Sequence, residues 1–237
     1  MTHDPHEHER AQDDGALAWR WLGRAARMSG SRAASAVVLA GGRSDRFGAQ
    51  KLASMLDGAP LLHHALAAVV PICDEVLVVG PAGGLPVGLP DGLGSTVISI
   101  LDERPFEGPL VALVHAARCA SRQRLLIVAG DMPDLQPAVL RRLLTFGGDH
   151  EGACLVAGGV PQPLPMAMLR DVALGRGADL IAAGERSLRG VIASLDMEAI
   201  AEPEWRQLDP GGWSLRDIDR PADLVACTGG LRASLEG

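Results

Sequence analysis

The chain has 237 residues, of which 47% are hydrophobic, and its formal net charge is −7. This length and hydrophobic content suit one sizeable core, so we expect one domain with one active site. The negative charge offers no basic surface for a phosphate backbone, which argues against nucleic acid as a partner. Apolar stretches are far shorter than the roughly 20 residues that span a bilayer. The acidic, His-rich start MTHDPHEHER does not resemble a secretory signal, so we expect a cytoplasmic protein with no membrane contact.

Residues 1–33 differ in composition from the rest of the chain. They combine a polar, charged start with an Ala-, Arg- and Trp-rich stretch, and we expect an N-terminal extension that is disordered apart from one short helix. His3, His6 and His8 could bind a metal, but one short tract without cysteine or a second ligand cluster is more often a solvated tail. We expect the folded domain to occupy residues 34–230.

From Ala34 onwards, short β-branched or Leu-rich runs alternate with longer amphipathic segments, which is the pattern of βαβ units. The predicted strands are Ser35–Leu39, Glu75–Val79, Ser95–Leu101, Leu125–Ala129 and Ala153–Ala157. The predicted helices are Pro60–Val70, Pro109–Ser121 and Pro137–Phe146, each with a proline in its first turn. Continuously apolar strands suit a parallel sheet that is covered on both faces. We therefore expect an α/β, Rossmann-like, three-layer fold with a mostly parallel sheet, which binds ligands at the carboxyl ends of its strands.

A glycine-rich segment, LAGGRSDRFGAQKL, follows the first predicted strand. Gly41 and Gly42 can adopt backbone angles closed to other residues and so present their N–H groups to a phosphate or a base edge. Arg43, Arg46 and Lys51 add positive charge. The spacing matches neither G-x-x-x-x-G-K-[ST] nor G-x-G-x-x-G. The segment predicts an anion-binding loop of another kind, and a tight turn with surface cations is the alternative.

Asp131 stands directly after the fourth predicted strand, in LLIVAGDMPDL. A carboxylate at this end of a parallel sheet suits Mg²⁺, which prefers oxygen ligands and commonly bridges to substrate phosphates. The alternative role is to cap the next helix, for which Asp134, ahead of Pro137, is the better candidate. We therefore predict Asp131 as a metal ligand.

The pattern L-A-G-G-x-S-x-R-x-G-x-x-K-L, followed by D-G-x-P-L-L at Asp57–Leu62, resembles the signature of the molybdenum cofactor nucleotidyltransferases. The resemblance runs from about Ala34 to Leu224 and includes the G-D-M-P around Asp131. It implies a nucleotidyltransferase fold and an Mg²⁺-dependent transfer of GMP from GTP to molybdopterin, with release of pyrophosphate. Phe47 and Gln50 depart from the commonest guanylyltransferase form, which has Met and Asp there.

The resemblance also implies roles for individual residues. It assigns catalysis to Lys51, Arg46 and Asp131, with Asp131 as the Mg²⁺ ligand. It assigns nucleotide binding to Leu39, Ala40, Gly41, Gly42, Arg43, Gly48 and Lys51.

A second nucleotide-binding segment is predicted after the third strand, in LDERPFEGPLVAL. Asp102 could accept hydrogen bonds from a base or ribose, or it could belong to a plain surface turn. Gly108, Pro109 and Leu110 open a predicted helix whose N-terminal amides favour anions. This start resembles the family's G-P-L-A-G-L, with Val and Ala in place of the second Ala-Gly.

The acceptor is expected to meet residues of the later part of the chain, namely Pro165, Arg186, Ser187, Arg189, Asp217 and Asp219. Pro165 lies in a segment that resembles the one before the family's acceptor site. The arginines mark a basic helix start suited to the acceptor's terminal phosphate, and a solvated helix face explains them equally well. Asp217 and Asp219 resemble the family's closing pair, and alternate positions of an extended segment point to one side. Their alternative role is to cap a helix that begins near Pro221.

Several points stay open at the level of sequence. The segments Leu39–Gly42 and Gly108–Leu110 resemble those of the relatives that transfer GMP, whereas Phe47 and the Asp217–Asp219 pair also resemble relatives that transfer CMP from CTP. A nucleotide-binding member with a regulatory rather than a catalytic role is a third possibility. The expected partners are GTP or CTP, a molybdopterin-type acceptor, and molybdoenzymes or other proteins of cofactor biosynthesis. The chain has no tyrosine, so Trp205 and Trp213 are the candidates for stacking on a flat ring.

Overall fold

The computed structural model describes residues 34–41, 51–90, 97–101 and 107–224. The predicted N-terminal extension, residues 1–33, lies outside the described residues. So do Gly42, Arg43, Arg46, Gly48 and Asp102 among the predicted site residues.

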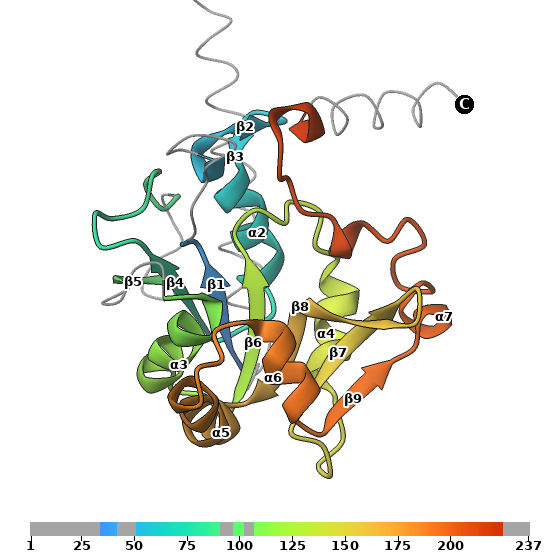
Figure 1. The fold of residues 1–237 in the computed structure, drawn as a ribbon. Helices are drawn as coiled ribbons and strands as arrows, with labels where there is room; N and C mark the ends of the chain where they lie inside the picture. Colours follow the sequence, from blue (N-terminus) through green and yellow to red (C-terminus); the bar gives the residue numbers. More distant parts are fainter. Residues whose placement is uncertain (1–33, 42–50, 91–96, 102–106, 225–237) are drawn as a thin grey trace, which may run out of the picture.

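A seven-stranded sheet in the order β5–β4–β1–β6–β8–β7–β9 forms the centre of the molecule (Figure 1). Its strands are β1 Ala34–Leu39, β4 Glu75–Gly80, β5 Val97–Leu101, β6 Arg124–Ala129, β7 Gly152–Ala157, β8 Val160–Leu169 and β9 Met197–Ile200. The first four in the spatial order run parallel, β8 is antiparallel to both its neighbours, and β9 is parallel to β7. The predicted α/β fold with a mostly parallel sheet is confirmed. The predicted strands form wherever the structure describes them, whereas β8 and β9 were not predicted.

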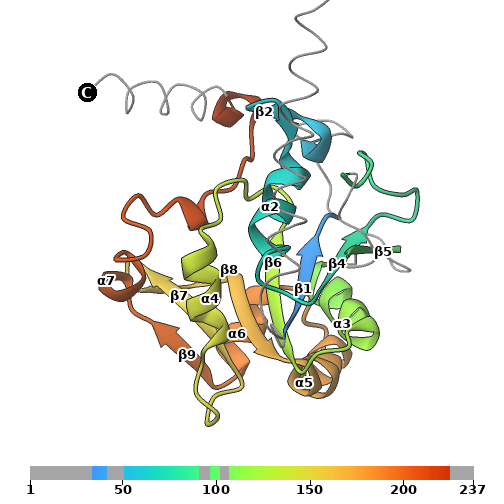
Figure 2. The same ribbon diagram turned by 180° about the vertical axis from the view of Figure 1, so that it is seen from behind.

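Helices cover both faces of the sheet and give the predicted three layers. α2 Leu61–Val69 and α4 Pro137–Leu144 lie on one face, which Figure 2 shows from the front. α3 Pro109–Cys119, α5 Arg170–Ala182 and α6 Leu188–Ser194 lie on the other face. Of these, α2, α3 and α4 confirm the three predicted helices, although each ends one or two residues before its predicted end. α6 confirms the predicted helix start near Ser187. α5 and the short α7 Glu202–Trp205 were not predicted.

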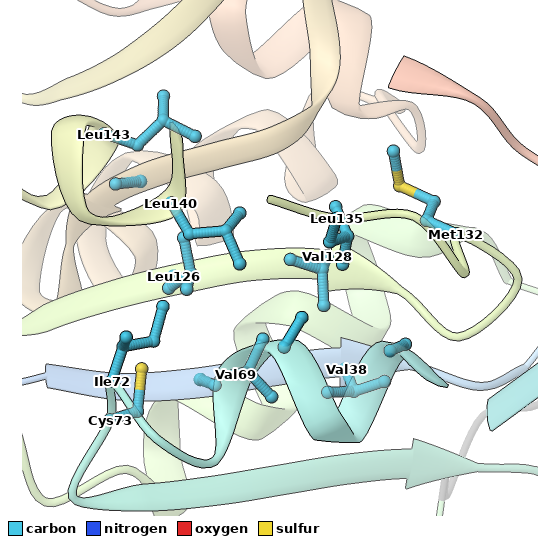
Figure 3. Close-up of a cluster of buried hydrophobic side chains, with 14 of the residues drawn as sticks. Val38, Val69, Ile72, Cys73, Leu126, Val128, Met132, Leu135, Leu140 and Leu143 are labelled. Atoms are coloured by element: carbon cyan, nitrogen blue, oxygen red, sulfur yellow. The ribbon is translucent and has the colours of Figure 1, made fainter. Parts of the chain in front are cut away.

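The sequence of β1 explains why its two faces build two cores. Ala36 and Val38 belong to the cluster under α2 and α4, whereas Val37 and Leu39 belong to the cluster under α3. Figure 3 shows the first cluster, in which Val38 of β1 and Val128 of β6 lie with side chains from the helices. Successive strand residues point to opposite faces, so a strand that is apolar at every position needs a helix layer on each side.

Strand β8 was missed because its first half, VPQPLP, is rich in proline, which lacks the N–H that a central ladder requires. The ladder with β6 involves only Met166–Leu169, beyond the prolines. On the other side, the register with β7 shifts between Cys154 and Val156. Pro163 and Pro165 thus fall where the recorded ladder pairs are interrupted.

A small antiparallel pair, β2 Met55–Leu56 and β3 Ala59–Pro60, precedes α2. Its turn places Asp57 and Gly58 at positive φ angles of 47° and 82°. The last described segment of the chain reaches this pair, because Ile218 packs with Leu56 and Leu61. The closing motif of the sequence is thereby brought to the carboxyl ends of the central strands (Figure 1).

Candidate active site

The candidate site lies at the carboxyl ends of β1 and β6. The chain passes from β1 to β4 and β5 on one side and then returns to β6 on the other, so β1 and β6 flank the point where the strand order reverses. This is the place where open α/β sheets bind ligands. The ladder extends past the strand ends, because Gly130 N donates to Leu39 O at 2.9 Å and Ala40 N donates to Val79 O at 2.8 Å. Ala40 and Gly41 are thus held beside the turn that carries Asp131.

Glycine at position 130 lets this turn pack closely. A Cβ there would lie 3.1 Å from Leu62 Cδ1 and 3.3 Å from Leu52 Cδ2. The following Met132 is 3% exposed, which anchors the other side of the turn. Asp131 therefore stands on a fixed backbone with its own side chain 24% exposed to solvent.

Lys51 joins two of the predicted site residues. Its Nζ donates to Asp131 Oδ2 at 2.7 Å and to Asp219 Oδ1 at 2.9 Å. Burial alone would lower the pKa of the ammonium, but the hydrogen bonds and charges of the two carboxylates outweigh this and raise its pKa above the usual 10.5. The glycine-rich segment, the turn after β6 and the closing motif thus meet at one cation.

Asp217 and Asp219 are exposed on either side of a buried Ile218, which is the alternation that was predicted. Ile218 between them is 0% exposed and donates its N–H to Asp131 O at 3.1 Å, so the flanking carboxylates face the opposite way. Desolvation and the nearby charges of Asp219 and Asp131 raise the pKa of Asp217 above its usual value.

Helix capping does not explain the aspartate pair. Residues 221–224 are helical, and Asp223 Oδ2 accepts the N–H groups of Asp219 at 2.9 Å and Arg220 at 2.7 Å. The start of this short helix is therefore capped by the side chain of its own Asp223. The carboxylate of Asp219 is left for Lys51.

Asp134 does not cap α4, so that expectation was wrong. Its Oδ2 accepts from Arg216 Nε at 2.9 Å and also from Arg216 Nη2. Gln136 is the N-cap residue of α4, and its backbone N–H donates to Ser214 Oγ at 3.0 Å. The Arg216 guanidinium offers this carboxylate two N–H donors and a full positive charge, whereas a backbone amide offers one N–H and no charge. Sequence reasoning missed Arg216, because its partner lies 82 residues away.

Gly108 and Arg186, predicted for different substrates, lie in contact. Gly108 has a φ of 109°, and a Cβ there would be 2.7 Å from Arg186 O. Leu110 N donates to the same Arg186 oxygen at 3.1 Å, so this amide of the α3 N-terminus is bonded within the protein rather than open to an anion. The close approach explains the need for glycine at position 108.

The predicted acceptor-binding arginine segment has local structural roles as well. The Arg186 guanidinium donates to Ile181 O and Glu185 O, both at 2.7 Å, near the end of α5. Ser187 is the N-cap of α6 and accepts from Gly190 N at 3.0 Å. Glu185, which sequence reasoning did not single out, accepts the N–H groups of Arg186 and Ser187. Arg189 is exposed in the first turn of α6.

The remaining candidates divide between core and surface. Pro165 is buried within β8. Trp205 is 0% exposed and its Nε1 donates to Val156 O at 2.8 Å, so the expectation that it could stack on a ligand was wrong. Trp213 is 47% exposed, with the Arg216 guanidinium 4.7 Å from its ring centroid. Of these two tryptophans, Trp213 is the one that lies at the surface.

The side chains around Lys51 suit a divalent cation. Two carboxylates, those of Asp131 and Asp219, contact one ammonium, and the charge of Asp217 acts on the same cluster, which leaves an excess of negative charge. Carboxylate oxygens are the ligands that Mg²⁺ prefers, usually one or two of them together with substrate phosphates. In the described ranges, no group of three His, Cys, Asp or Glu side chains forms a metal cage of protein ligands alone.

Known structures share this fold. Molybdopterin-guanine dinucleotide biosynthesis protein A from Archaeoglobus fulgidus aligns with a TM-score of 0.65 at 21% identity, over 81% of this chain and 96% of its own. The 2-C-methyl-D-erythritol 4-phosphate cytidylyltransferase from Thermus thermophilus aligns with a TM-score of 0.59 at 18% identity, over 83% and 98%. The fold is that of the α/β nucleotidyltransferases.

The sequence comparison narrows this class. The profile of the MobA-like NTP transferase domain matches residues 36–200, so the chain belongs to this family and is a nucleotidyltransferase. A probable molybdenum cofactor guanylyltransferase from Chloroflexus aggregans is 33% identical over 80% of this chain and 91% of its own. Another from Deinococcus radiodurans is 32% identical over 85% and 97%. Nucleotidyltransferases of this kind use a divalent metal ion. Within the described part of the chain, no helix is long and apolar enough to cross a membrane.

Proposed function

We propose that the protein transfers GMP from GTP to molybdopterin and releases pyrophosphate. The names of its relatives support the substrates, and one observation supports the chemistry. Lys51 Nζ lies 2.7 Å from Asp131 and 2.9 Å from Asp219 at the point where the strand order reverses. A cation-binding cluster beside a glycine-rich turn is what a triphosphate with its metal ion requires.

In the proposed reaction, Asp131 holds Mg²⁺, and Asp217 and Asp219 add negative charge beside it. The bound metal supplies charge neutralisation on the α-phosphate and on the leaving pyrophosphate. The acceptor's terminal phosphate attacks the α-phosphate in line, which forms a new P–O bond as the bond to pyrophosphate breaks. Because that phosphate is ionised near neutral pH, the protein's main task is to position the two reactants.

Different residues of the protein are proposed to bind the two substrates. Leu39, Ala40, Gly41, Gly42, Arg43, Arg46 and Gly48 are proposed to bind the nucleotide, and Lys51 is proposed to contact its phosphates. Asp102 and the start of α3, Gly108–Leu110, are also proposed to bind the nucleotide. Pro165, Arg186, Ser187 and Arg189 lie on the acceptor side. The contact between Gly108 and Arg186 O supports a joint boundary of the two subsites.

The fold is shared with cytidylyltransferases, and Asp217 and Asp219 are also found in relatives that use CTP, so the base is tested directly. We further propose that the reaction takes place in the cytoplasm and that its product passes to molybdoenzymes or other cofactor-biosynthesis proteins. Residues 34–230 are proposed as the catalytic domain, with residues 1–33 dispensable for turnover.

The test measures pyrophosphate release by the full chain with Mg²⁺ and molybdopterin, with GTP and CTP supplied separately. We expect release with GTP, and an Asp131→Asn variant should lose it by roughly 10³-fold, because the metal loses its anionic ligand. Asp171→Asn is the matched control, since that side chain is 70% exposed and lies at the start of α5. Pyrophosphate release with CTP alone would show that CTP, and not GTP, is the nucleotide substrate. If the protein binds nucleotide but releases pyrophosphate with neither GTP nor CTP, a regulatory role takes the place of the proposed catalytic one.

A further inference from the structure

Lys51 occupies the place of a cation between two carboxylates. Its ammonium lies 2.7 Å from Asp131 Oδ2 and 2.9 Å from Asp219 Oδ1, and its side chain is 11% exposed. Both an ammonium and a hard divalent cation seek anionic oxygens, so the two compete for the same side chains. The described structure therefore shows the acidic cluster with its negative charge partly neutralised by the protein itself.

A metal ion that entered this cluster would lie within a few ångströms of the ammonium. Repulsion between a univalent and a divalent cation at such a separation weakens metal binding by roughly tenfold or more. The metal and Lys51 would also compete for the same carboxylate oxygens. Binding of the metal therefore favours a state in which Lys51 has left them.

The attachment of Lys51 allows this movement. Lys51 begins the short η1 helix, Lys51–Ala53, whose next residue, Leu52, packs against the core. The backbone is thus anchored, while the flexible four-carbon stem of a lysine can carry its ammonium to another anion. The phosphates of a nucleoside triphosphate are such an anion.

We propose that Lys51 is an internal competitor of the metal ion, which occupies the carboxylates until nucleotide phosphates draw its ammonium away. The proposal rests on the proposed function, in which Lys51 contacts those phosphates. It makes metal and nucleotide binding mutually favourable, because each removes the obstacle to the other, and such coupling is reciprocal. The free enzyme holds the divalent cation weakly, and the metal is bound together with the triphosphate.

The experiment titrates the full-length, nucleotide-free protein with Mn²⁺ and follows free Mn²⁺ by electron paramagnetic resonance. Lys51→Gln keeps a hydrogen-bond donor but removes the charge, so it should bind Mn²⁺ roughly tenfold or more tightly than the wild type. Lys51→Arg keeps the charge and is the matched control, which should bind as weakly as the wild type. Unchanged or weaker binding by Lys51→Gln would overturn the proposal.

A double variant locates the effect. Lys51→Gln combined with Asp131→Asn should lose the gain in affinity, and a gain that persists would mean that Mn²⁺ binds elsewhere and would overturn the proposal. A non-hydrolysable triphosphate should tighten Mn²⁺ binding more in the wild type than in Lys51→Gln, and equal tightening would likewise contradict it. Thermal unfolding checks each variant, and Lys51→Met replaces Lys51→Gln if the latter does not fold.

The titration of nucleotide-free protein uses neither acceptor nor turnover. Its failure would leave the proposed transferase reaction standing and would remove only the competition by Lys51. Conversely, absence of pyrophosphate release with both nucleotides would remove the reaction without changing the Mn²⁺ affinities of the free protein.

Discussion

The two halves of the central sheet differ in how they are built. In the half formed by β5, β4, β1 and β6, all strands are parallel. In the half formed by β8, β7 and β9, two antiparallel pairings, a register shift and proline-containing β8 interrupt the regular pattern. The first half carries the segments proposed to bind the nucleotide, and the second leads to the segments proposed to bind the acceptor.

The parallel half has the arrangement of strands with which α/β enzymes commonly bind nucleotides. Triphosphate binding needs strand ends, glycine turns and a cation site, all of which a parallel sheet provides at one edge. The second half is fixed by side-chain contacts. Arg142 of α4 bonds to Glu198 of β9 and Glu204 of α7, both at 2.6 Å. Trp205 of α7 is buried in the same region, where its Nε1 donates to Val156 O of β7.

The largest effect is expected in the second half, at its buried tryptophan. Trp205→Ala should lower the free energy of unfolding by about 3–5 kcal/mol, because it removes a wholly buried ring and leaves Val156 O without its donor. Urea unfolding followed by circular dichroism measures this. Trp213→Ala is the control, since that ring is 47% exposed and should cost below about 1 kcal/mol. A single shared transition would show that the halves unfold together, and a separate early transition for Trp205→Ala would show that they do not.

The next effect is expected where the two halves meet, at Gly108. Gly108→Ala should cost about 1–3 kcal/mol, because alanine is strained at a φ of 109° and its Cβ would lie 2.7 Å from Arg186 O. The KM values for nucleotide and for acceptor should both rise if the segment forms the proposed boundary between the two subsites. Gly84→Ala has a similar φ of 91° with no atom within 4 Å, so it reports strain alone. An equal effect of both variants on KM would contradict the shared boundary.

The smallest effect is expected from two carboxylates that anchor the halves, Glu75 and Glu198. For Glu75, burial opposes ionisation, but hydrogen bonds from Ser35 and Ser121 outweigh it and lower the pKa. For Glu198, the hydrogen bond from Arg142 lowers the pKa.

A carboxyl group with a lowered pKa in the folded state stabilises the fold above its unfolded pKa. This contribution is lost as pH falls through the folded pKa. Glu75→Gln and Glu198→Gln should therefore each cost below about 1 kcal/mol at pH 7, with the difference from the wild type shrinking in acid. Unfolding curves recorded from pH 7 to pH 3 provide the measurement. A difference that grows in acid would contradict the direction of both pKa shifts.

Much of the candidate site followed from the sequence. Asp131 was predicted from its place after an apolar strand, and Lys51 from its place after the glycine turn. Their contact at 2.7 Å is consistent with both predictions. The predicted alternation of Asp217 and Asp219 around Ile218 appears as two exposed residues on either side of a buried one. The wrong expectations, helix capping by Asp134 and ligand stacking by Trp205, concerned side chains whose partners are remote in sequence.

The sequence by itself determined the parallel half of the sheet, because continuous apolar strands and helix-starting prolines are local patterns that need no knowledge of their neighbours. Only the tertiary structure decided that β8 inserts antiparallel between β6 and β7, since local propensity disfavours a strand rich in proline. It also decided that Arg216 pairs with Asp134, that Arg186 O meets Gly108, and that Lys51 bridges Asp131 and Asp219. These contacts join residues far apart along the chain, and side-chain type alone does not specify which of many possible partners the fold brings within hydrogen-bonding distance.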